Sequence, residues 1–264
     1  MRIKYNMSII YAIILGIVQG LTEFLPVSSS GHLVLLQNIF GIKNDIILFD
    51  VILHLGTLIA VFIVYRKTIW ELLKKPFSKK MQYLIVGTIP TVVIALLFKD
   101  FFEGAFSGDF LFIGFLATAI LLIIADFCDK KYINKYEMNF ARVGVMGLFQ
   151  GFAIMPGLSR SGSTITSAIV MGVNKKDALE YSFLLSIPII LASMLYELIK
   201  TPINSISIGI LPILFGFVFS ALFGYLAIKF MIKLVQNNSY KYFSIYLILL
   251  SIFLILNKYV FRLF

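Results

Sequence analysis

A motif of fourteen residues occurs twice in this chain, and each copy interrupts an apolar segment. Residues 19–32 match residues 150–163, which lie 131 positions later. In both copies Pro and Gly, which break helices, are followed by a cluster of Ser. When 16–32 is aligned with 147–163, six of seventeen positions are identical: Gly16/Gly147, Gln19/Gln150, Gly20/Gly151, Ser28/Ser159, Ser30/Ser161 and Gly31/Gly162. A duplicated apolar segment with a broken middle predicts two irregular turns buried at membrane depth.

Composition indicates a membrane protein. The chain is 60% hydrophobic and only 14% charged, with long apolar runs, which is typical of polytopic membrane proteins. The net charge of +10 is expected to come from cytoplasmic loops beside anionic lipid, so we expect no nucleic-acid partner. Cys128 is the single cysteine, which excludes an intrachain disulfide and a cysteine metal cluster. We expect one multi-pass membrane domain over 1–264.

Segment lengths separate spanning helices from re-entrant ones. A spanning helix needs about 20 apolar residues, and segments 30–42 and 160–173 are too short. We therefore pair 7–25 with 30–42, and 140–155 with 160–173, as two re-entrant helix–loop–helix hairpins. The remaining apolar segments predict six transmembrane helices, at about 47–65, 82–98, 110–127, 178–199, 206–233 and 241–262. The predicted fold is an all-α polytopic membrane protein.

Three spanning helices follow each hairpin, so the two halves must have opposite orientations. This is an inverted-topology repeat, with repeat 1 at about 7–127 and repeat 2 at about 140–262. Loop 66–81 has six basic residues and one acidic residue, whereas loop 99–109 has three acidic residues and one Lys. The charge bias places the first loop in the cytoplasm and the second outside. It predicts that the first hairpin enters from outside and the second from the cytoplasm. Both termini are then outside, although two basic residues near the N-terminus do not fit the rule that basic residues stay in the cytoplasm.

Three ionisable residues lie at the two motif copies: Glu23 and His32 in the first, and Arg160 in the second. Ionisable side chains at membrane depth are costly and usually functional. Ser at a helix start caps free N–H groups, which together with the helix dipole form an anion site, and Gly permits close backbone approach. The planar fork of Arg matches phosphate oxygens. We predict that a diphosphate is bound by the two helix starts, at Ser28, Ser29, Ser30, Gly31, Gly157, Ser159, Ser161 and Gly162.

Glu23 and His32 suggest the chemistry of such a site. A carboxylate can orient an imidazole and favour its protonated form. A Ser hydroxyl or a water would need a base, and the leaving phosphate would need charge stabilisation. Gln19 lies one turn before Glu23, so the two side chains could offer oxygen ligands to a divalent cation, Mg²⁺ or Ca²⁺.

Simpler interpretations exist for several of these residues. The Ser run can be a helix cap alone, and Gln19 and Gln150 can be interhelical hydrogen bonders. Asp50 and His54, one turn apart, are either a structural pair or part of the site. Ionisable residues at matching repeat positions are nevertheless hard to explain by packing alone. We therefore prefer the interpretation as a site.

The same residues resemble a known family. Residues 19–23, the run Pro-Val-Ser-Ser-Ser-Gly-His at 26–32 and the later run at 156–164 resemble the bacitracin-resistance type of undecaprenyl-pyrophosphate phosphatase. The likeness extends over nearly the whole chain in length, segment order and motifs. The resemblance implies removal of the terminal phosphate of a C55 polyprenyl diphosphate, which recycles the lipid carrier of cell-wall glycans. It also implies a divalent cation, a site open to the outer face and an inverted repeat with two re-entrant hairpins.

The resemblance also implies roles by position. Glu23 would orient His32 or hold metal, Ser29 would be the attacking hydroxyl or its neighbour, His32 the base or nucleophile, and Arg160 the diphosphate clamp. Hydrogen bonds to phosphate are implied for Ser28, Ser159, Ser161 and Thr164. One departure is Gln19, where the family usually has Glu. The family tolerates Gln there, and the lost charge is expected to weaken metal binding or change the cation preference.

Two other functions fit part of the pattern. A polyprenyl-phosphate flippase or other transporter could be built on the same inverted repeat. An acid phosphatase that handles lipid phosphates shares two short motifs, but it requires a second His, and this chain has none after Arg160. The residues leave open the nucleophile (Ser29, His32 or water), the prenyl chain length, the metal and the oligomeric state, including a homodimer.

Overall fold

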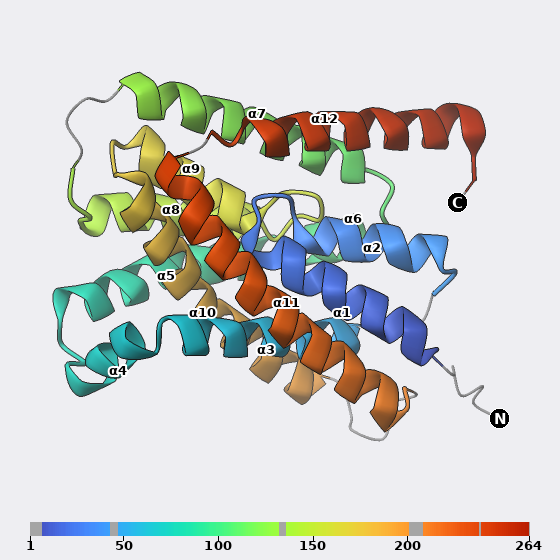
Figure 1. Cartoon of the computed structure of the whole chain (residues 1–264), viewed down its shortest axis with the longest axis horizontal. Coiled ribbons are helices and arrows are strands. Elements are labelled where there is room, and N and C mark those ends of the chain that lie inside the picture. The colour runs from blue at the N-terminus through green and yellow to red at the C-terminus, as the bar shows by residue number, and fades with distance from the viewer. Residues whose placement is uncertain (1–6, 43–46, 132–135, 201–207, 238, 264) are drawn as a thin grey trace.

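The computed structural model describes residues 7–42, 47–131, 136–200, 208–237 and 239–263, and the regular elements of this part are all helices (Figure 1). The helices are α1 (Ile9–Phe24), α2 (Ser29–Ile39), α3 (Ile47–Val64), α4 (Arg66–Lys74), α5 (Lys79–Leu97), α6 (Lys99–Ala105), α7 (Leu111–Lys131), α8 (Phe140–Phe152), α9 (Arg160–Val170), α10 (Lys175–Lys200), α11 (Ile210–Asn237), α12 (Lys241–Leu256) and the π-helical turn η2 (Asn257–Phe261).

Five of these helices are candidate membrane spans, and the bent pair α3–α4 is a sixth if it is counted as one span. The helices α5, α7, α10, α11 and α12 are each long and apolar enough to cross a bilayer, and α3 meets the same criteria together with α4, from which it is separated by an 83° bend. These segments match the six predicted spans. The polytopic helical membrane fold is therefore confirmed.

The two predicted hairpins are formed by shorter helices. The helices α1 and α2 have 16 and 11 residues, and α8 and α9 have 13 and 11. At 1.5 Å per residue none of them reaches across a hydrocarbon core of about 30 Å. Figure 1 shows that each pair turns near the middle of the molecule, between the spanning helices. The irregular backbone of the turns is thus surrounded by protein, as membrane depth requires.

Two segments that the charge pattern treated only as loops contain helices, α4 and α6. The helix α4 is amphipathic, with Lys and Arg beside the exposed Trp70 and Leu73. An amphipathic helix of this kind is typical of segments that lie along a membrane surface. A reading of mean hydropathy misses it, because its polar and apolar faces cancel in the average.

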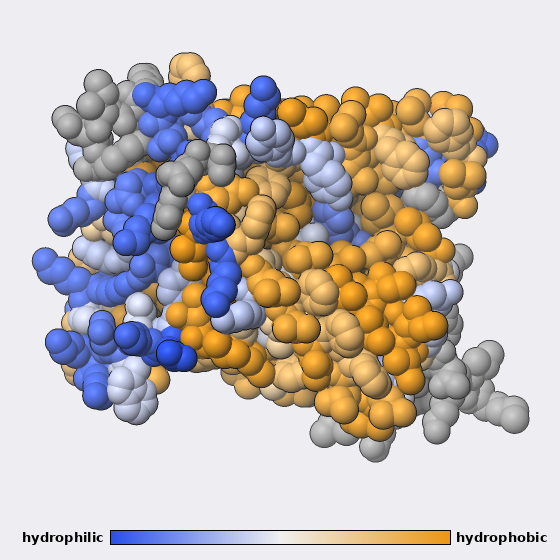
Figure 2. Space-filling view, in the orientation of Figure 1, coloured by the Kyte–Doolittle hydropathy of each residue, from blue (hydrophilic) through white to orange (hydrophobic). Residues whose placement is uncertain are grey.

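On the face that Figure 2 shows, hydrophilic and apolar residues are separated along the long axis of the molecule. Hydrophilic side chains gather at the end that carries α4, and the surface beyond this end is mainly apolar (Figure 2). The helix α1 begins, and η2 ends, at the opposite end (Figure 1). The ion pair Lys80–Glu180 joins the first turns of α5 and α10, and Lys175–Asp129 joins the start of α10 to the end of α7. This polarity agrees with the orientation predicted from the charge bias.

The two halves pack against each other reciprocally. The first hairpin helix α1 packs on α11, and the corresponding helix α8 packs on α5. A Cβ atom at Gly16 would lie 2.4 Å from the carbonyl oxygen of Gly216, and one at Gly147 would lie 2.0 Å from that of Gly87. The identity of Gly16 and Gly147 therefore has a physical reason: backbones approach directly at both positions, as small residues allow in membrane helix pairs.

Candidate active site

The turns of the two hairpins meet in the centre of the molecule. A Cβ atom at Gly31 would lie 2.8 Å from Gly157 Cα. Gly157 has φ +87°, a left-handed conformation that favours glycine. Thr118 of α7 joins the second turn, because its Oγ1 accepts from Ser159 N (2.9 Å) and lies 3.1 Å from Gly157 O. The second turn is thereby fixed to α7, and the first turn packs against it at Gly31.

Both second hairpin helices begin with a Ser cap. Ser28 Oγ accepts from Gly31 N at 3.3 Å, and Ser159 Oγ accepts from Gly162 N at 3.0 Å. Ser28 also has φ 70°, which is rare for a residue other than glycine and costs on the order of 1–3 kcal/mol. The predicted caps are therefore confirmed. The next residues along the chain, Ser29 and Arg160, occupy matching positions at the starts of α2 and α9.

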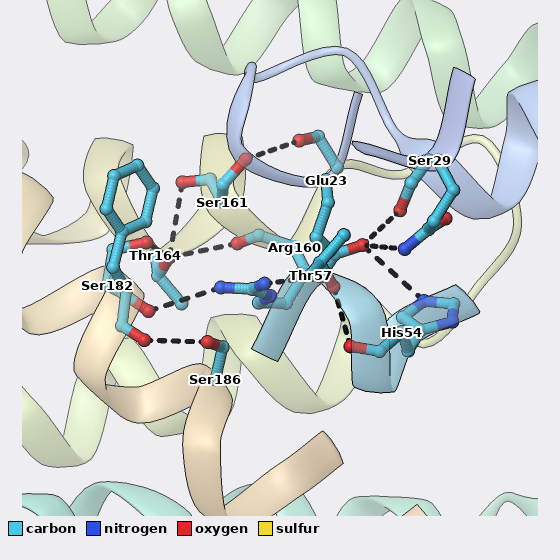
Figure 3. A network of polar contacts seen from close by, with 12 residues as sticks. Glu23, Ser29, His54, Thr57, Arg160, Ser161, Thr164, Ser182 and Ser186 are labelled. Carbon is cyan, nitrogen blue, oxygen red and sulfur yellow. Dashed lines mark hydrogen bonds and ion pairs between the residues drawn. The ribbon is translucent and has the colours of Figure 1, made fainter. Parts of the chain in front are cut away.

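Glu23, near the end of α1, is the centre of the site (Figure 3). It is 6% exposed. Its Oε1 accepts from Arg160 Nη2 at 2.5 Å, and its Oε2 accepts from Ser29 Oγ at 2.6 Å and from Gln19 Nε2 at 2.9 Å. His54 Nε2 lies 3.5 Å from the same Oε2. The carboxylate of one hairpin is thus bound to the guanidinium of the other.

A second group of contacts holds Arg160 from the side of α10. Arg160 Nη1 donates to Ser182 O at 3.2 Å, and Thr164 Oγ1 lies 2.7 Å from Ser182 Oγ. Ser161 Oγ donates to Leu25 O of the first hairpin at 3.2 Å (Figure 3). Ser182 therefore belongs to the site, which the sequence did not predict. A single Ser in a membrane helix is too common to indicate a function.

The other predicted phosphate ligands lie at the same two turns. Ser30 Oγ is 3.4 Å from Ser28 Oγ, and Ser159 Oγ is 3.3 Å from Ser161 Oγ. The hydroxyl groups are therefore gathered at the positive ends of α2 and α9. Their role as phosphate ligands, and that of Gly31, Gly157, Gly162 and Thr164, stays a prediction.

The prediction that Glu23 orients His32 was wrong. His32 Nδ1 donates to the carbonyl oxygen of Ser28 at 2.7 Å, and His32 Nε2 lies 2.6 Å from the hydroxyl of Tyr246 on α12. Ser28 is one helical turn before His32, so its carbonyl is within reach of the ring. The histidine beside Glu23 is His54 instead. The spacing of residues along the chain could not predict that Tyr246 contacts His32 or that His54 lies beside Glu23. Both contacts depend on how distant helices pack.

The two repeat-related glutamines differ in their surroundings. Gln150 Nε2 donates to Thr91 Oγ1 on α5 at 3.1 Å. Gln150 thus makes an interhelical hydrogen bond, as its simpler interpretation predicted. Gln19 donates to Glu23 instead. The Oε1 atoms of both glutamines are buried without a hydrogen-bond partner among the described residues, and that of Gln19 belongs to the side chain that contacts a carboxylate. Oxygen atoms are the ligands that Mg²⁺ and Ca²⁺ prefer. Gln19 Oε1 and the Glu23 carboxylate therefore fit a divalent cation whose remaining ligands are phosphate oxygens or water, although no group of three His, Cys, Asp or Glu in the described residues could hold one alone.

Comparison with known proteins identifies the family. A family model described as "Bacitracin resistance protein BacA" matches residues 12–253. The chain belongs to the bacitracin resistance protein family. Family members named undecaprenyl-diphosphatase are similar over almost their whole length. One from Carboxydothermus hydrogenoformans is 44% identical over 245 residues, covering 91% of this chain and 94% of the relative.

Two more family members extend the comparison. Undecaprenyl-diphosphatase 4 of Bacillus cereus (strain ZK / E33L) is 42% identical over 238 residues, covering 89% of this chain and 92% of the relative. An undecaprenyl-diphosphatase of Methanosphaera stadtmanae is 38% identical over 274 residues, covering 95% of this chain and 98% of the relative. Both copies of the motif, 19–32 and 150–163, lie inside the segment that the family model matches.

Proposed function

We propose that this multi-pass membrane protein hydrolyses undecaprenyl diphosphate to the monophosphate and inorganic phosphate, which recycles the lipid carrier of cell-wall synthesis. The observation that carries the proposal is the contact of Glu23 with both Ser29 and Arg160, which brings a hydroxyl, a carboxylate and a guanidinium together at membrane depth. The names of the similar family members support this substrate and reaction rather than a transporter.

The diphosphate binds between the two hairpins. The positive ends of α2 and α9, with their capping serines, suit an anion. Arg160 presents a fork of N–H donors that matches phosphate oxygens. A charged headgroup can therefore leave water for this site while the prenyl chain stays in the bilayer.

The hydroxyl of Ser29 is the best-placed nucleophile. Ser29 Oγ donates to Glu23 Oε2 at 2.6 Å, the distance expected for a nucleophile and its base. His32 Nε2 is directed at Tyr246 instead. Glu23 takes the hydroxyl proton, Ser29 Oγ bonds to the terminal phosphorus, and the bond from this phosphorus to the bridging oxygen breaks. Undecaprenyl phosphate leaves, and water then releases inorganic phosphate from Ser29.

Charge stabilisation falls to Arg160 and to a divalent cation. Arg160 neutralises the negative charge that grows on the bridging oxygen. Gln19 Oε1 and the Glu23 carboxylate would hold Mg²⁺ or Ca²⁺, which when bound neutralises further phosphate charge. Gln19 keeps an oxygen ligand without bringing a second negative charge.

The protein is placed in the plasma membrane with its hydrophilic, basic end in the cytoplasm. The basic residues around α4 support this orientation. The α1–α2 hairpin then opens to the outer face, where the diphosphate is left after the lipid carrier has delivered its glycan.

Phosphate release by the purified protein tests the proposal. Undecaprenyl diphosphate with Mg²⁺ is expected to yield phosphate, and Glu23→Ala, Ser29→Ala and Arg160→Ala are each expected to lower kcat/KM by about 100-fold or more. His32→Ala, measured beside them, is expected to lose less. An active Arg160→Ala variant would contradict the site, and lipid transport in sealed liposomes without phosphate release would favour the transporter.

A further inference from the structure

His54 is the second histidine of the chain, and its ring is aimed at the centre of the site. It lies on α3, one turn after Asp50. His54 Nδ1 donates to the backbone carbonyl of Asp50 at 2.7 Å, because a carbonyl oxygen only accepts. This contact takes the single N–H of a neutral imidazole, so Nε2, which faces Glu23 Oε2 at 3.5 Å (Figure 3), donates to the carboxylate when the ring carries a second proton.

The position of His54 is tied to the helix that carries Ser29. Gln37, two turns along α2, donates to both carboxylate oxygens of Asp50, at 2.8 and 3.0 Å. Asp50 in turn holds His54 through its carbonyl. The hydroxyl of Ser29 and the imidazole of His54 therefore reach Glu23 from one connected unit, formed by α2 and α3.

The two oxygens of Glu23 have different partners. Oε1 is paired with Arg160, whereas Oε2 faces Ser29, Gln19 and His54. A diphosphate competes for the guanidinium of Arg160, and this competition weakens the hold on Oε1. The groups around Oε2 must then keep the carboxylate directed at Ser29. The His54 side chain is 28% exposed against 5% for Glu23, so the histidine stands on the accessible side of the carboxylate.

We propose that His54 is a positioning residue for the reaction, which keeps Glu23 Oε2 directed at Ser29 when the substrate engages Arg160. The inference rests on the proposed function, since it needs Glu23 as the base. It goes beyond that function by giving the α3 histidine a role that neither repeat motif contains. Its effect falls on the chemical step, because His54 acts through Glu23 and leaves Arg160 and the helix starts to bind phosphate.

Substitution of His54 by Gln or by Asn tests the two ring nitrogens one at a time. In His54→Gln the amide nitrogen replaces Nε2 and can still donate to Glu23. In His54→Asn the amide replaces Nδ1 and reaches only the Asp50 carbonyl. We expect His54→Asn to lower kcat by about 10- to 100-fold with KM within about threefold, the range in which misplacement of a reacting group is felt. We expect His54→Gln to retain most of the rate.

A double-mutant cycle measures the coupling between His54 and Glu23, which a purely structural role of His54 would not produce. In a Glu23→Gln background, His54→Asn is expected to cause no further loss, because the group on which His54 acts is already impaired. Equal rates for His54→Asn and wild type, equal losses for the Asn and Gln variants, or additive losses in the cycle would each overturn the inference alone. A wild-type protein that releases no phosphate would overturn the proposed function, and this inference with it.

Discussion

At the scale of single residues, the site depends on one buried carboxylate with a different partner for each oxygen. Arg160 uses Nη2 for Glu23 and Nη1 for the Ser182 carbonyl, so it connects both halves of the protein. The sequence predicted Glu23 and Arg160 because a charge at membrane depth is rare and informative. It predicted Ser29 from the serine cluster at a helix start and from the family resemblance. It could not predict that His54 rather than His32 lies beside Glu23, because both rings choose their partners only after distant helices have packed.

Replacement of Arg160 by Lys tests whether charge alone is enough. One ammonium group cannot reproduce the two directions in which the guanidinium donates. We expect Arg160→Lys to lower kcat/KM for phosphate release by about 10- to 100-fold, equivalent to roughly 1.4–2.8 kcal/mol. The exposed Arg66→Lys, on α4, is the control and should behave as wild type. Full activity of Arg160→Lys would show that the fork geometry is unimportant.

The contact between His32 and Tyr246 gives a second prediction for single residues. Tyr246→Phe keeps the stacked ring but removes the hydroxyl that lies 2.6 Å from His32 Nε2. The buried nitrogen then loses its partner, which should lower the free energy of unfolding by about 1–3 kcal/mol in detergent. Tyr242→Phe, exposed on the same helix, should leave it unchanged. Equal stability of both variants would argue against the contact.

At the scale of elements, the two hairpins were predictable and the surface helices were not. Pro, Gly and Ser stand where the chain turns, so the ends of α1, α2, α8 and α9 follow from local chemistry. The helices α4 and α6 lie between spans, where a reading of hydropathy and charge predicts only a loop. A helix of one to three turns is marginal alone and is stabilised mainly by the surface against which it packs. The residues of the helix do not reveal that surface.

The repeated glycine contacts of these elements can be tested with a matched pair on α8. Gly147→Ala places a Cβ 2.0 Å from the Gly87 carbonyl oxygen, so α8 must move away from α5. We expect a loss of about 1–3 kcal/mol of stability from this overpacking, with lower activity. Gly144→Ala has no atom within 4 Å of its new Cβ and should be neutral or slightly stabilising. Thermal unfolding in detergent compares the two, and indistinguishable midpoints would count against close α5–α8 packing.

At the scale of the whole molecule, the inverted repeat explains how residues 137 positions apart come to share one site. The turns of the two hairpins meet at Gly31 and Gly157. An odd number of spans per half predicts that the two hairpins enter from opposite sides of the membrane, and this orientation stays a prediction. The limits of the halves, about 7–127 and 140–262, stay a prediction, as does the identity of the bound cation.

Cysteine labelling in intact cells tests the orientation on which the site's access depends. Cys128→Ser first removes the single native thiol. Phe77→Cys then marks the segment between α4 and α5, and Ser107→Cys marks the segment between α6 and α7; both residues are exposed. The basic segment should stay in the cytoplasm because moving its charge across the membrane is unfavourable. A membrane-impermeant maleimide should therefore label Ser107→Cys at once, and Phe77→Cys only after permeabilisation. The reverse pattern would place the α1–α2 hairpin, and with it Ser29 and Glu23, within reach of the cytoplasm instead.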